Sequence, residues 1–249
     1  MGFELEICVN SIHSALAAQE GGASRVELCD NMAEGGTTPS AGMVTRCKKL
    51  LNIPVFPIIR PRGGDFLYSE EEFQVMKQDI SFCKEAGCEG VVIGILRADG
   101  TIDIDRCAEL IALARPMEVT FHRAFDRCND LEKGLEDIIS LGCERVLTSG
   151  GEASAIEAIT QLTQLVKQAD GRISIMPGSG IIEDNISTLA VQTGAKQFHS
   201  TAKATTFSAM LYKGAGKLAH HDGDFPLLQT SEEKVYKMKQ ILVGLSHKV

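Results

Sequence analysis

The sequence predicts a (β/α)8 TIM barrel, a single domain that ends in a C-terminal extension. Eight short β-like runs alternate with longer helical patterns along the chain. Four glycines each end a helical pattern and open a β-like run, as left-handed helix stops do: Gly22, Gly87, Gly142 and Gly194. The 249 residues also suit a barrel that forms one domain. An open, doubly wound sheet is the alternative arrangement of such units.

The eight strands are expected at Glu4–Val9, Arg25–Cys29, Pro54–Ile59, Gly90–Gly94, Glu118–Phe121, Arg145–Leu147, Ile173–Met176 and Gln197–His199. Helical patterns lie between them, among others at Ile12–Glu20, Glu70–Ala86, Asp103–Ala114 and Leu131–Leu141. Ser69 and Glu72 form a capping box that begins one of these helices. The even-numbered strands follow the glycine stops, whereas Pro54 and Pro116 precede odd-numbered ones. The chain therefore consists of four βαβα units in series.

Residues 1–202 are expected to form the barrel core, and residues 203–249 the extension, within the same domain. The extension is mostly irregular in pattern, with one helix predicted at Glu232–Leu245. That helix is a candidate for the final barrel helix, displaced by an insertion. Because eight units can close a barrel before residue 203, the segment Thr205–Pro226 exceeds what closure requires. It is predicted to cover the rim of the barrel or to contact a second subunit.

The barrel interior is predicted to be unusually polar. Side chains alternate between the two faces of a strand, and the apolar set must face the helices. This leaves inside the barrel Glu4, Glu6, Cys8, Arg25, Glu27, Cys29, Glu118, Thr120, His122, Gln197 and His199. Buried charges must be paired or coordinated. Near the strand starts, Glu4 and Arg25 are interpreted as structural, whereas groups at the strand ends, where barrels build their sites, are interpreted as functional.

Arginines and glycines follow several strands at this functional end. Arg60 and Arg62 lie in the stretch PIIRPRGGDF, just past the third strand, and Arg123 follows the fifth. Guanidinium groups suit carboxylate or phosphate. The MPGSGI loop after the seventh strand, where barrels often bind phosphate, adds the backbone of Gly178, Ser179 and Gly180. The rim is predicted to bind a small anionic ligand or an anionic protein segment; solvated charges and tight turns are the alternatives.

Two of the eight cysteines differ from the rest. Cys8 and Cys29 end neighbouring strands and share the inward parity. Parallel strands lie about 4.8 Å apart, so the two thiolates can converge on one ion. Two sulfur ligands favour Cu(I) over zinc, and core filling is the alternative. No cysteines form a CxxC pair, and packing is the interpretation for Cys47, Cys83, Cys88, Cys107, Cys128 and Cys143.

The composition excludes several classes of function. A net charge of −8 and a pI near 5.3 argue against a protein that neutralises many nucleic-acid phosphates. No apolar run is long enough for a membrane span, and the N-terminal residues do not form a secretory signal. We therefore expect a cytoplasmic protein with no nucleic-acid or membrane partner, in which the cysteines are thiols.

The strand-end motifs together resemble one protein family. They are LEICVNS, RVELCD, EGGTTPS, PIIRPRGGDFLYS, VTFHRAFD, RVLTSGG, MPGSGI and FHSTA. From about residue 4 to residue 202 the chain is similar to the copper homeostasis protein CutC family. The resemblance implies a cytoplasmic (β/α)8 barrel that forms homo-oligomers, usually dimers. It also implies copper binding, with Cys8 and Cys29 matching the cysteines proposed as Cu(I) ligands. It implies no particular enzymatic reaction.

Three functional hypotheses remain. The first is a cytosolic Cu(I)-binding protein that uses Cys8 and Cys29, with His199 or His122 as a further donor. The second is an enzyme acting on a small anionic substrate, with Glu27 or His122 as acid–base groups and the three rim arginines as a clamp. The third is a non-catalytic scaffold that binds a protein partner through the long tail. No organic cofactor is indicated.

Overall fold

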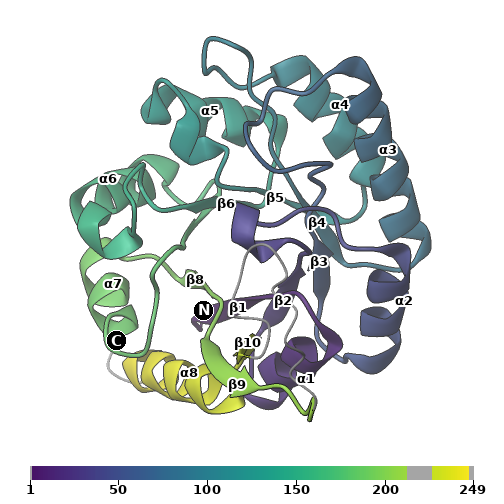
Figure 1. The fold of residues 1–249 in the computed structure, drawn as a ribbon. Helices are drawn as coiled ribbons and strands as arrows, with labels where there is room; N and C mark the ends of the chain where they lie inside the picture. Colours follow the sequence, from purple (N-terminus) through teal and green to yellow (C-terminus); the bar gives the residue numbers. More distant parts are fainter. Residues whose placement is uncertain (1, 212–225, 247–249) are drawn as a thin grey trace.

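The computed structural model describes residues 2–211 and 226–246, and these form the predicted TIM barrel (Figure 1). Eight parallel strands lie inside a ring of helices, and each strand begins within three residues of its expected position. Their bounds are β1 Glu4–Val9, β2 Arg25–Leu28, β3 Val55–Pro57, β4 Gly90–Ile93, β5 Glu118–Phe121, β6 Arg145–Thr148, β7 Ser174–Pro177 and β8 Gln197–Ser200.

The strands close into a barrel rather than an open sheet. β1 pairs in parallel with both β2 and β8, which joins the two ends of the strand series. Between β3 and β4, the N–H of Ile59 donates to the carbonyl of Val92 at 2.8 Å. Between β7 and β8, the Gln197 amide donates to the Ser174 hydroxyl at 3.3 Å. The doubly wound alternative is therefore wrong, because an open sheet leaves its outer strands unpaired on one side.

The helices surround the strands in chain order. They are α1 Ile12–Glu20, α2 Ala41–Leu50, α3 Glu70–Glu85, α4 Ile104–Ala114, α5 Leu131–Leu141, α6 Ile159–Ala169, α7 Ile186–Thr193 and α8 Glu232–Ser246, with 3-10 turns η1 Met32–Glu34, η2 Phe125–Arg127 and η3 Ala155–Ala158. The capping box of Ser69 and Glu72 is present at the start of α3. All four predicted glycine stops have φ between +75° and +87°. Within the described ranges, no helix combines the length and apolar character needed to cross a membrane.

The predicted alternation of faces is confirmed. Leu5, Ile7 and Val9 belong to the large apolar core between strands and helices. Cys8 and Cys29 belong instead to a small separate cluster inside the barrel, with Phe56, Ile58 and Val92. The ring of Phe56 fills the barrel so closely that a Cβ on Gly90 of β4 would lie 2.0 Å from it.

Paired charges occupy the N-terminal part of the barrel, as expected for Arg25. Its guanidinium donates to Glu6 at 2.5 Å, to Glu4 at 2.7 Å and to the Gln197 amide oxygen at 2.8 Å. Arg145 pairs in the same way with Glu118. The buried Arg25 side chain is thus satisfied by fixed partners, which gives it a structural role.

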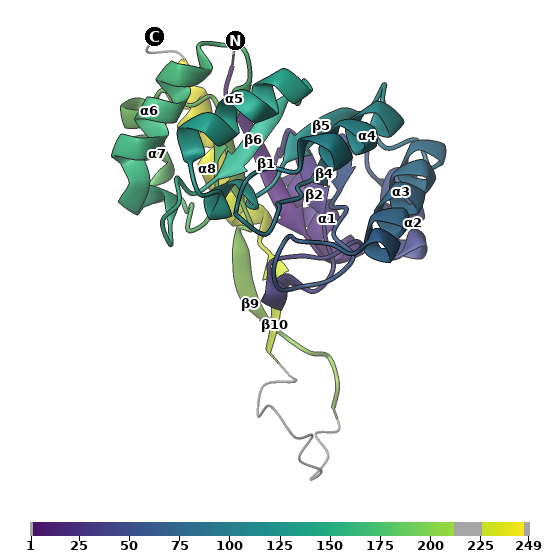
Figure 2. The same cartoon turned by 90° about the horizontal axis from the view of Figure 1, so that it is seen from above.

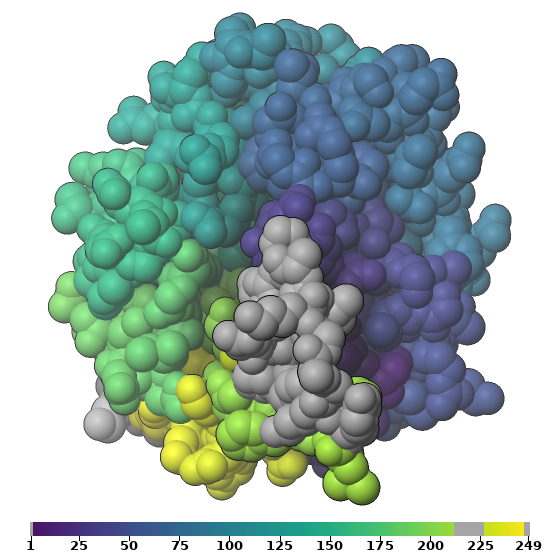
Figure 3. Space-filling view, in the orientation of Figure 1, coloured from purple at the N-terminus to yellow at the C-terminus, as the bar shows by residue number. Residues whose placement is uncertain are grey.

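The extension contains a hairpin that the sequence patterns did not reveal. β9, Lys203–Phe207, pairs antiparallel with β10, Pro226–Thr230, and projects from the barrel (Figure 2). α8 then packs against α1, α7 and β1, with Val235, Met238 and Leu242 fully buried. α8 is therefore the eighth barrel helix, displaced by the hairpin. In the space-filling view, N-terminal residues in purple and hairpin residues in light green lie on the same face of the molecule (Figure 3).

Candidate metal centre and ligand cavity

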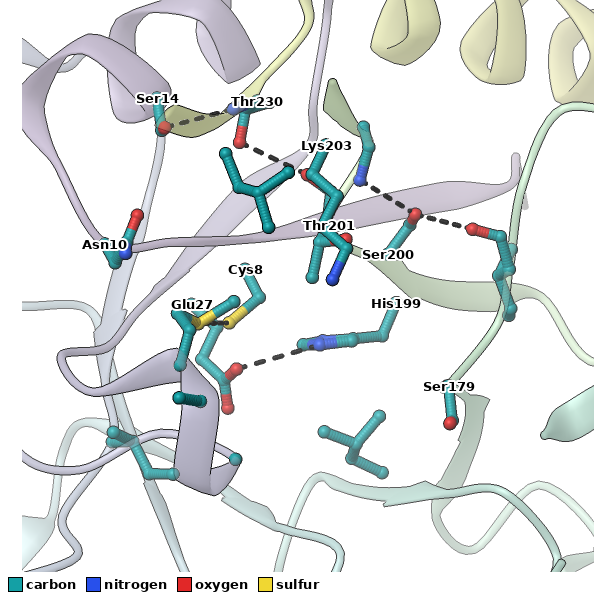
Figure 4. Close-up of a pocket in the computed structure, with 18 of the residues that line it drawn as sticks. Cys8, Asn10, Ser14, Glu27, Ser179, His199, Ser200, Thr201, Lys203 and Thr230 are labelled. Atoms are coloured by element: carbon teal, nitrogen blue, oxygen red, sulfur yellow. Dashed lines mark hydrogen bonds and ion pairs between the residues drawn. The ribbon is translucent and has the colours of Figure 1, made fainter. Parts of the chain in front are cut away.

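A cavity of about 1100 Å³ lies at the C-terminal ends of the strands. Cys8 of β1, Glu27 of β2 and His199 of β8 line it (Figure 4). His122, directly after β5, lines it as well. The base of the hairpin supplies another wall through Lys203, Leu227, Leu228, Gln229 and Thr230. The part of Thr205–Pro226 that was predicted to cover the rim falls largely on residues outside the described ranges. A volume of this size is typical of a pocket for a small organic molecule.

Three sulfur atoms meet on one side of this cavity. The Sγ atoms of Cys8 and Cys29 are 3.2 Å apart, and the Cys8 Sγ is 3.4 Å from the Sδ of Met32. The register aligns Cys8 on β1 with Glu27 on β2, so Cys29 follows at the next inward position. Sulfur and carboxylate donors of Cys8, Glu27 and Cys29 all lie within 4.8 Å of one another. This is a soft donor set with one carboxylate at its edge.

Met32 was not found by sequence reasoning. It lies in η1, directly after β2, and packs against the inner cluster that contains both cysteines. Asn31 has a left-handed backbone, φ 45°, which turns the chain back at this point. A signal was present in the sequence: the methionine follows Cys29 by three residues, and a thioether is a soft ligand.

His199 connects the sulfur atoms to buried carboxylates. Its Nδ1 lies 2.7 Å from Glu6 Oε1, and its Nε2 lies 3.7 Å from Glu27 Oε2. Glu6 is completely buried, and burial alone would raise its pKa. The neighbouring Arg25 charge and the bonds with His199 outweigh burial and lower the pKa of Glu6 to about 2.

The remaining groups of this network affect one another's pKa values. The hydrogen bond with Cys29 lowers the pKa of Cys8 to about 5, and His199 adds to the effect against the opposing burial. Burial, followed by the negative charge of Cys8, raises the pKa of Glu27 well above its usual range. Burial opposes the charged form of His199, but its bonds to Cys8 and Glu6 raise its pKa well above the usual value. The network therefore favours the charged forms of both the Cys8 thiol and the His199 ring.

His122, at the end of β5, has a different environment. Its Nδ1 accepts the backbone N–H of Ala124 at 3.1 Å, so the proton of the neutral ring lies on Nε2. Burial, followed by the charge of Arg60, lowers the pKa of His122 to about 3. The ring packs against Phe66, with centroids 5.0 Å apart. This histidine is a neutral hydrogen-bond donor, and not a base that titrates near neutral pH.

The two arginines of the PIIRPRGGDF stretch separate in the structure. Arg60 is buried, lines the cavity and donates to the carbonyls of Glu34, Gly36 and Gly64. Arg62 does not line it; instead it pairs with Asp65 at 3.0 Å and Glu72 at 2.6 Å. Pro61 between them leaves the two side chains pointing to different surroundings.

Some of the other predicted rim residues line the cavity, and others do not. Arg123 lines the cavity and pairs with Asp126 at 2.7 Å. Ser179 and Gly180 line it as well, and both have positive φ, 74° and 71°. Gly178 packs below them, where a Cβ would lie 2.5 Å from Leu147. The structure thus gathers Arg60, Arg123, Ser179 and Gly180 around one cavity with Cys8, and leaves out Arg62 and Gly178.

Fold and site together define a TIM-barrel protein with a cysteine-lined cavity at its functional end. The CutC family model matches residues 3–204, and the chain belongs to the CutC family. A family protein CutC of Chromobacterium violaceum is 49% identical over 96% of this chain and 97% of its own. The copper homeostasis protein cutC homolog of Mus musculus is 46% identical over 96% of this chain and 89% of its own. A crystal structure of the putative copper homeostasis protein CutC of Streptococcus agalactiae has a TM-score of 0.77 and 35% identity, covering 80% of this chain and 98% of that one.

Proposed function

We propose that this protein binds Cu(I) in copper homeostasis, with Cys8 and Cys29 as ligands. The observation that carries the proposal is the cluster of three sulfur atoms, with 3.2 Å between the thiols and 3.4 Å to the thioether of Met32. Thiolate and thioether ligands select Cu(I) among the common cellular metals. The names of the mouse and human relatives as copper homeostasis protein homologs agree with this choice. Copper is cargo here, bound and released.

We assign the third ligand position to Met32 in preference to His199. Both ring nitrogens of His199 already face carboxylates, those of Glu6 and Glu27. The Met32 sulfur lies beside Cys8 and needs no deprotonation to bind a metal. In this assignment His199 does not bind the metal. It holds the Cys8 ligand in its charged form and in position, as residues that contact metal ligands commonly do.

The test is a Cu(I) titration of the reduced protein in competition with a chromophoric Cu(I) chelator. Wild type should bind close to one equivalent. Cys8→Ser with Cys29→Ser should abolish binding, because a hydroxyl is a poor ligand for a soft ion. Cys83→Ser with Cys88→Ser is the matched control, and it should bind as wild type does.

Met32→Leu, which keeps the apolar volume but removes the sulfur, should weaken binding. If Met32→Leu binds Cu(I) as tightly as wild type does, Met32 is not a copper ligand. Copper retained by the Cys8 and Cys29 double variant, or lost equally from the control while it remains folded, contradicts the assignment itself.

We also propose a cytoplasmic location and a homodimer. All eight cysteines are free thiols, which suits a reducing compartment. The projecting hairpin carries exposed apolar side chains, with Phe207 84% and Leu228 58% exposed. A two-stranded hairpin with such a surface is marginal by itself, and a second subunit would cover it.

A second candidate function is an enzyme that acts on a small anionic substrate. The cavity of about 1100 Å³ favours it, because that volume far exceeds the need of one ion. In that function the Glu27 carboxyl, whose pKa is raised by burial, would act as general acid, and Nε2 of His122 would donate a hydrogen bond. Incubation with carboxylated and phosphorylated metabolites, followed by mass spectrometry, tests it. Turnover by wild type that is lost in Glu27→Gln supports it, and no turnover counts against it.

A further inference from the structure

Three buried polar side-chain atoms among the described residues lack a hydrogen-bond partner, and all three lie in one place. They are Nε of Arg60, the hydroxyl of Tyr68 and Nε2 of His122. Burial lowers the pKa of His122 and raises that of Tyr68; the Arg60 charge adds to the first shift, and the charge and close side-chain contact of Arg60 oppose the second. Folded proteins satisfy nearly all such atoms, so a cluster of orphans indicates a missing partner.

Arg60 is a buried cation that forms no salt bridge among the described residues, since the nearby exposed Asp65 pairs with Arg62. Only 3% of its surface is exposed, and its guanidinium donates to three backbone carbonyls. The other buried arginines of the barrel differ, since Arg25 and Arg145 each pair with a glutamate. A buried charge without a counterion is costly. Arg60 therefore has both the charge and the free Nε–H to bind an anion.

His122 supplies a second donor at the same wall of the cavity. Its tautomer is set by the N–H of Ala124, which leaves Nε2 protonated and unpartnered. Arg60 and His122 both line the cavity. The ring of Phe66 contacts both: it lies 5.0 Å from the Arg60 guanidinium carbon and 5.0 Å from the His122 ring. The π face of Phe66 thus occupies the position next to the guanidinium where a counterion would be expected.

We propose that Arg60 and His122 bind the carboxylate of a small organic ligand in the cavity, and that this carboxylate displaces the ring of Phe66. One positive charge and two free N–H donors match a monoanionic group with two oxygens. A phosphate dianion would need more charge and more donors than this wall offers. The inference rests on the second proposed function, whose ligand class it specifies, and it is independent of copper binding.

The ring of Phe66 lines the cavity. Phe66 is only partly buried, whereas Arg60, Tyr68 and His122 are each 97% buried. Phe66 follows Gly63 and Gly64 in the loop after β3. Gly64 has φ +80°, a left-handed conformation that suits a change of chain direction. Removing the ring should therefore expose the donors to a ligand without disturbing the barrel strands.

The experiment measures binding of acetate, benzoate and inorganic phosphate to the metal-free protein by calorimetry. The imidazole Nε2 signal of His122 is followed by ¹⁵N NMR. We expect a carboxylate to bind and to shift the Nε2 signal. Arg60→Ala should weaken binding at least tenfold, and Phe66→Ala should strengthen it because the ring no longer competes. Arg106→Ala is the matched control, since this arginine also stacks on a phenylalanine, Phe73, but does not line the cavity.

Each outcome decides the inference. The inference is overturned if neither wild type nor Phe66→Ala binds a carboxylate, or if the protein binds phosphate alone. Equal binding by wild type and Arg60→Ala also overturns it. If Arg60→Ala does not fold, His122→Phe replaces it, with the same expected loss. Carboxylate binding by a protein that turns over none of the carboxylated and phosphorylated metabolites supports the inference and counts against the enzyme, so the two failures are distinguishable.

Discussion

Glu6 is the group whose replacement should reveal how the barrel interior is held together. Its side chain is fully buried and contacts Arg25 at 2.5 Å and His199 at 2.7 Å. These cations lower its pKa from 4.5 to about 2, even though burial opposes the charge. Glu6→Gln keeps the shape and one acceptor oxygen but removes the charge from between two cations.

The magnitude follows from the lowered pKa of Glu6. A tenfold change in an acid dissociation constant corresponds to about 1.4 kcal/mol, so the fall in pKa from 4.5 to about 2 means that ionised Glu6 contributes about 3 kcal/mol to folding. Removal of one partner from a buried ion pair typically costs about 3–5 kcal/mol. We therefore expect Glu6→Gln to lower the free energy of unfolding by about 3 kcal/mol at pH 7.

The lowered pKa also fixes the pH dependence. Because the folded-state pKa is below the unfolded-state pKa, the contribution is complete above pH 4.5 and is lost as the pH falls toward 2. The difference between wild type and Glu6→Gln should thus be constant from pH 7 to about pH 5 and shrink below that.

Urea unfolding followed by circular dichroism at pH 7, 5, 4 and 3 measures these differences. Glu109→Gln is the control, because Glu109 is half exposed and pairs with Lys77 at the surface. Such a pair contributes less than about 1 kcal/mol. Equal losses of stability in both variants, or a Glu6→Gln difference that does not change with pH, would show that the buried Glu6 charge does not stabilise the fold in this way.

Two further variants test the sulfur cluster and the hairpin. Gly36→Ala should lower the free energy of unfolding by about 1–2 kcal/mol and weaken Cu(I) binding. Gly36 has φ +94°, and a Cβ at this position would lie 3.2 Å from the Cys29 sulfur. An unchanged free energy of unfolding in urea and an unchanged Cu(I) affinity in titration would contradict this prediction. Phe207→Ser should shift the protein toward monomer in sedimentation velocity, because the ring is 84% exposed on the hairpin. Val191→Ser, 68% exposed on α7, is its control and should leave the assembly unchanged; equal effects would remove the hairpin from the interface.

The order of strands, helices and inward faces followed from local rules. Alternation of apolar and polar residues placed Cys8, Glu27 and His199 inside the barrel, because successive side chains of a strand point to opposite faces and the apolar ones face the helices. Glycine stops and the capping box at Ser69 set where helices end and begin, because these depend on a few neighbouring residues. The pairing of Cys8 with Cys29 also followed, since adjacent parallel strands end at the same edge.

Side chains beyond the strand ends were not determined in this way. Arg60 and Arg62 have the same chemistry and nearly the same position, yet Arg60 is buried at the cavity and Arg62 pairs with Glu72 on α3. Met32 joined the cysteines because a left-handed residue turned the chain after β2. These outcomes depend on loop conformations and on contacts with distant segments, for which the sequence has no periodic signal.

From its sequence the chain could be predicted to form alternating strands and helices, and the inward row of each strand could be named, whereas the pairing of β1 with β8 closed the barrel. The strand and helix patterns repeat with fixed periods of backbone geometry, so a short window of residues is sufficient to specify them. The pairing of the buried charges, the neutral ring of His122 and the lack of a salt bridge at Arg60 among the described residues became visible in the folded chain. Burial and long-range neighbours set these properties, because the energy of a charge depends on everything packed around it.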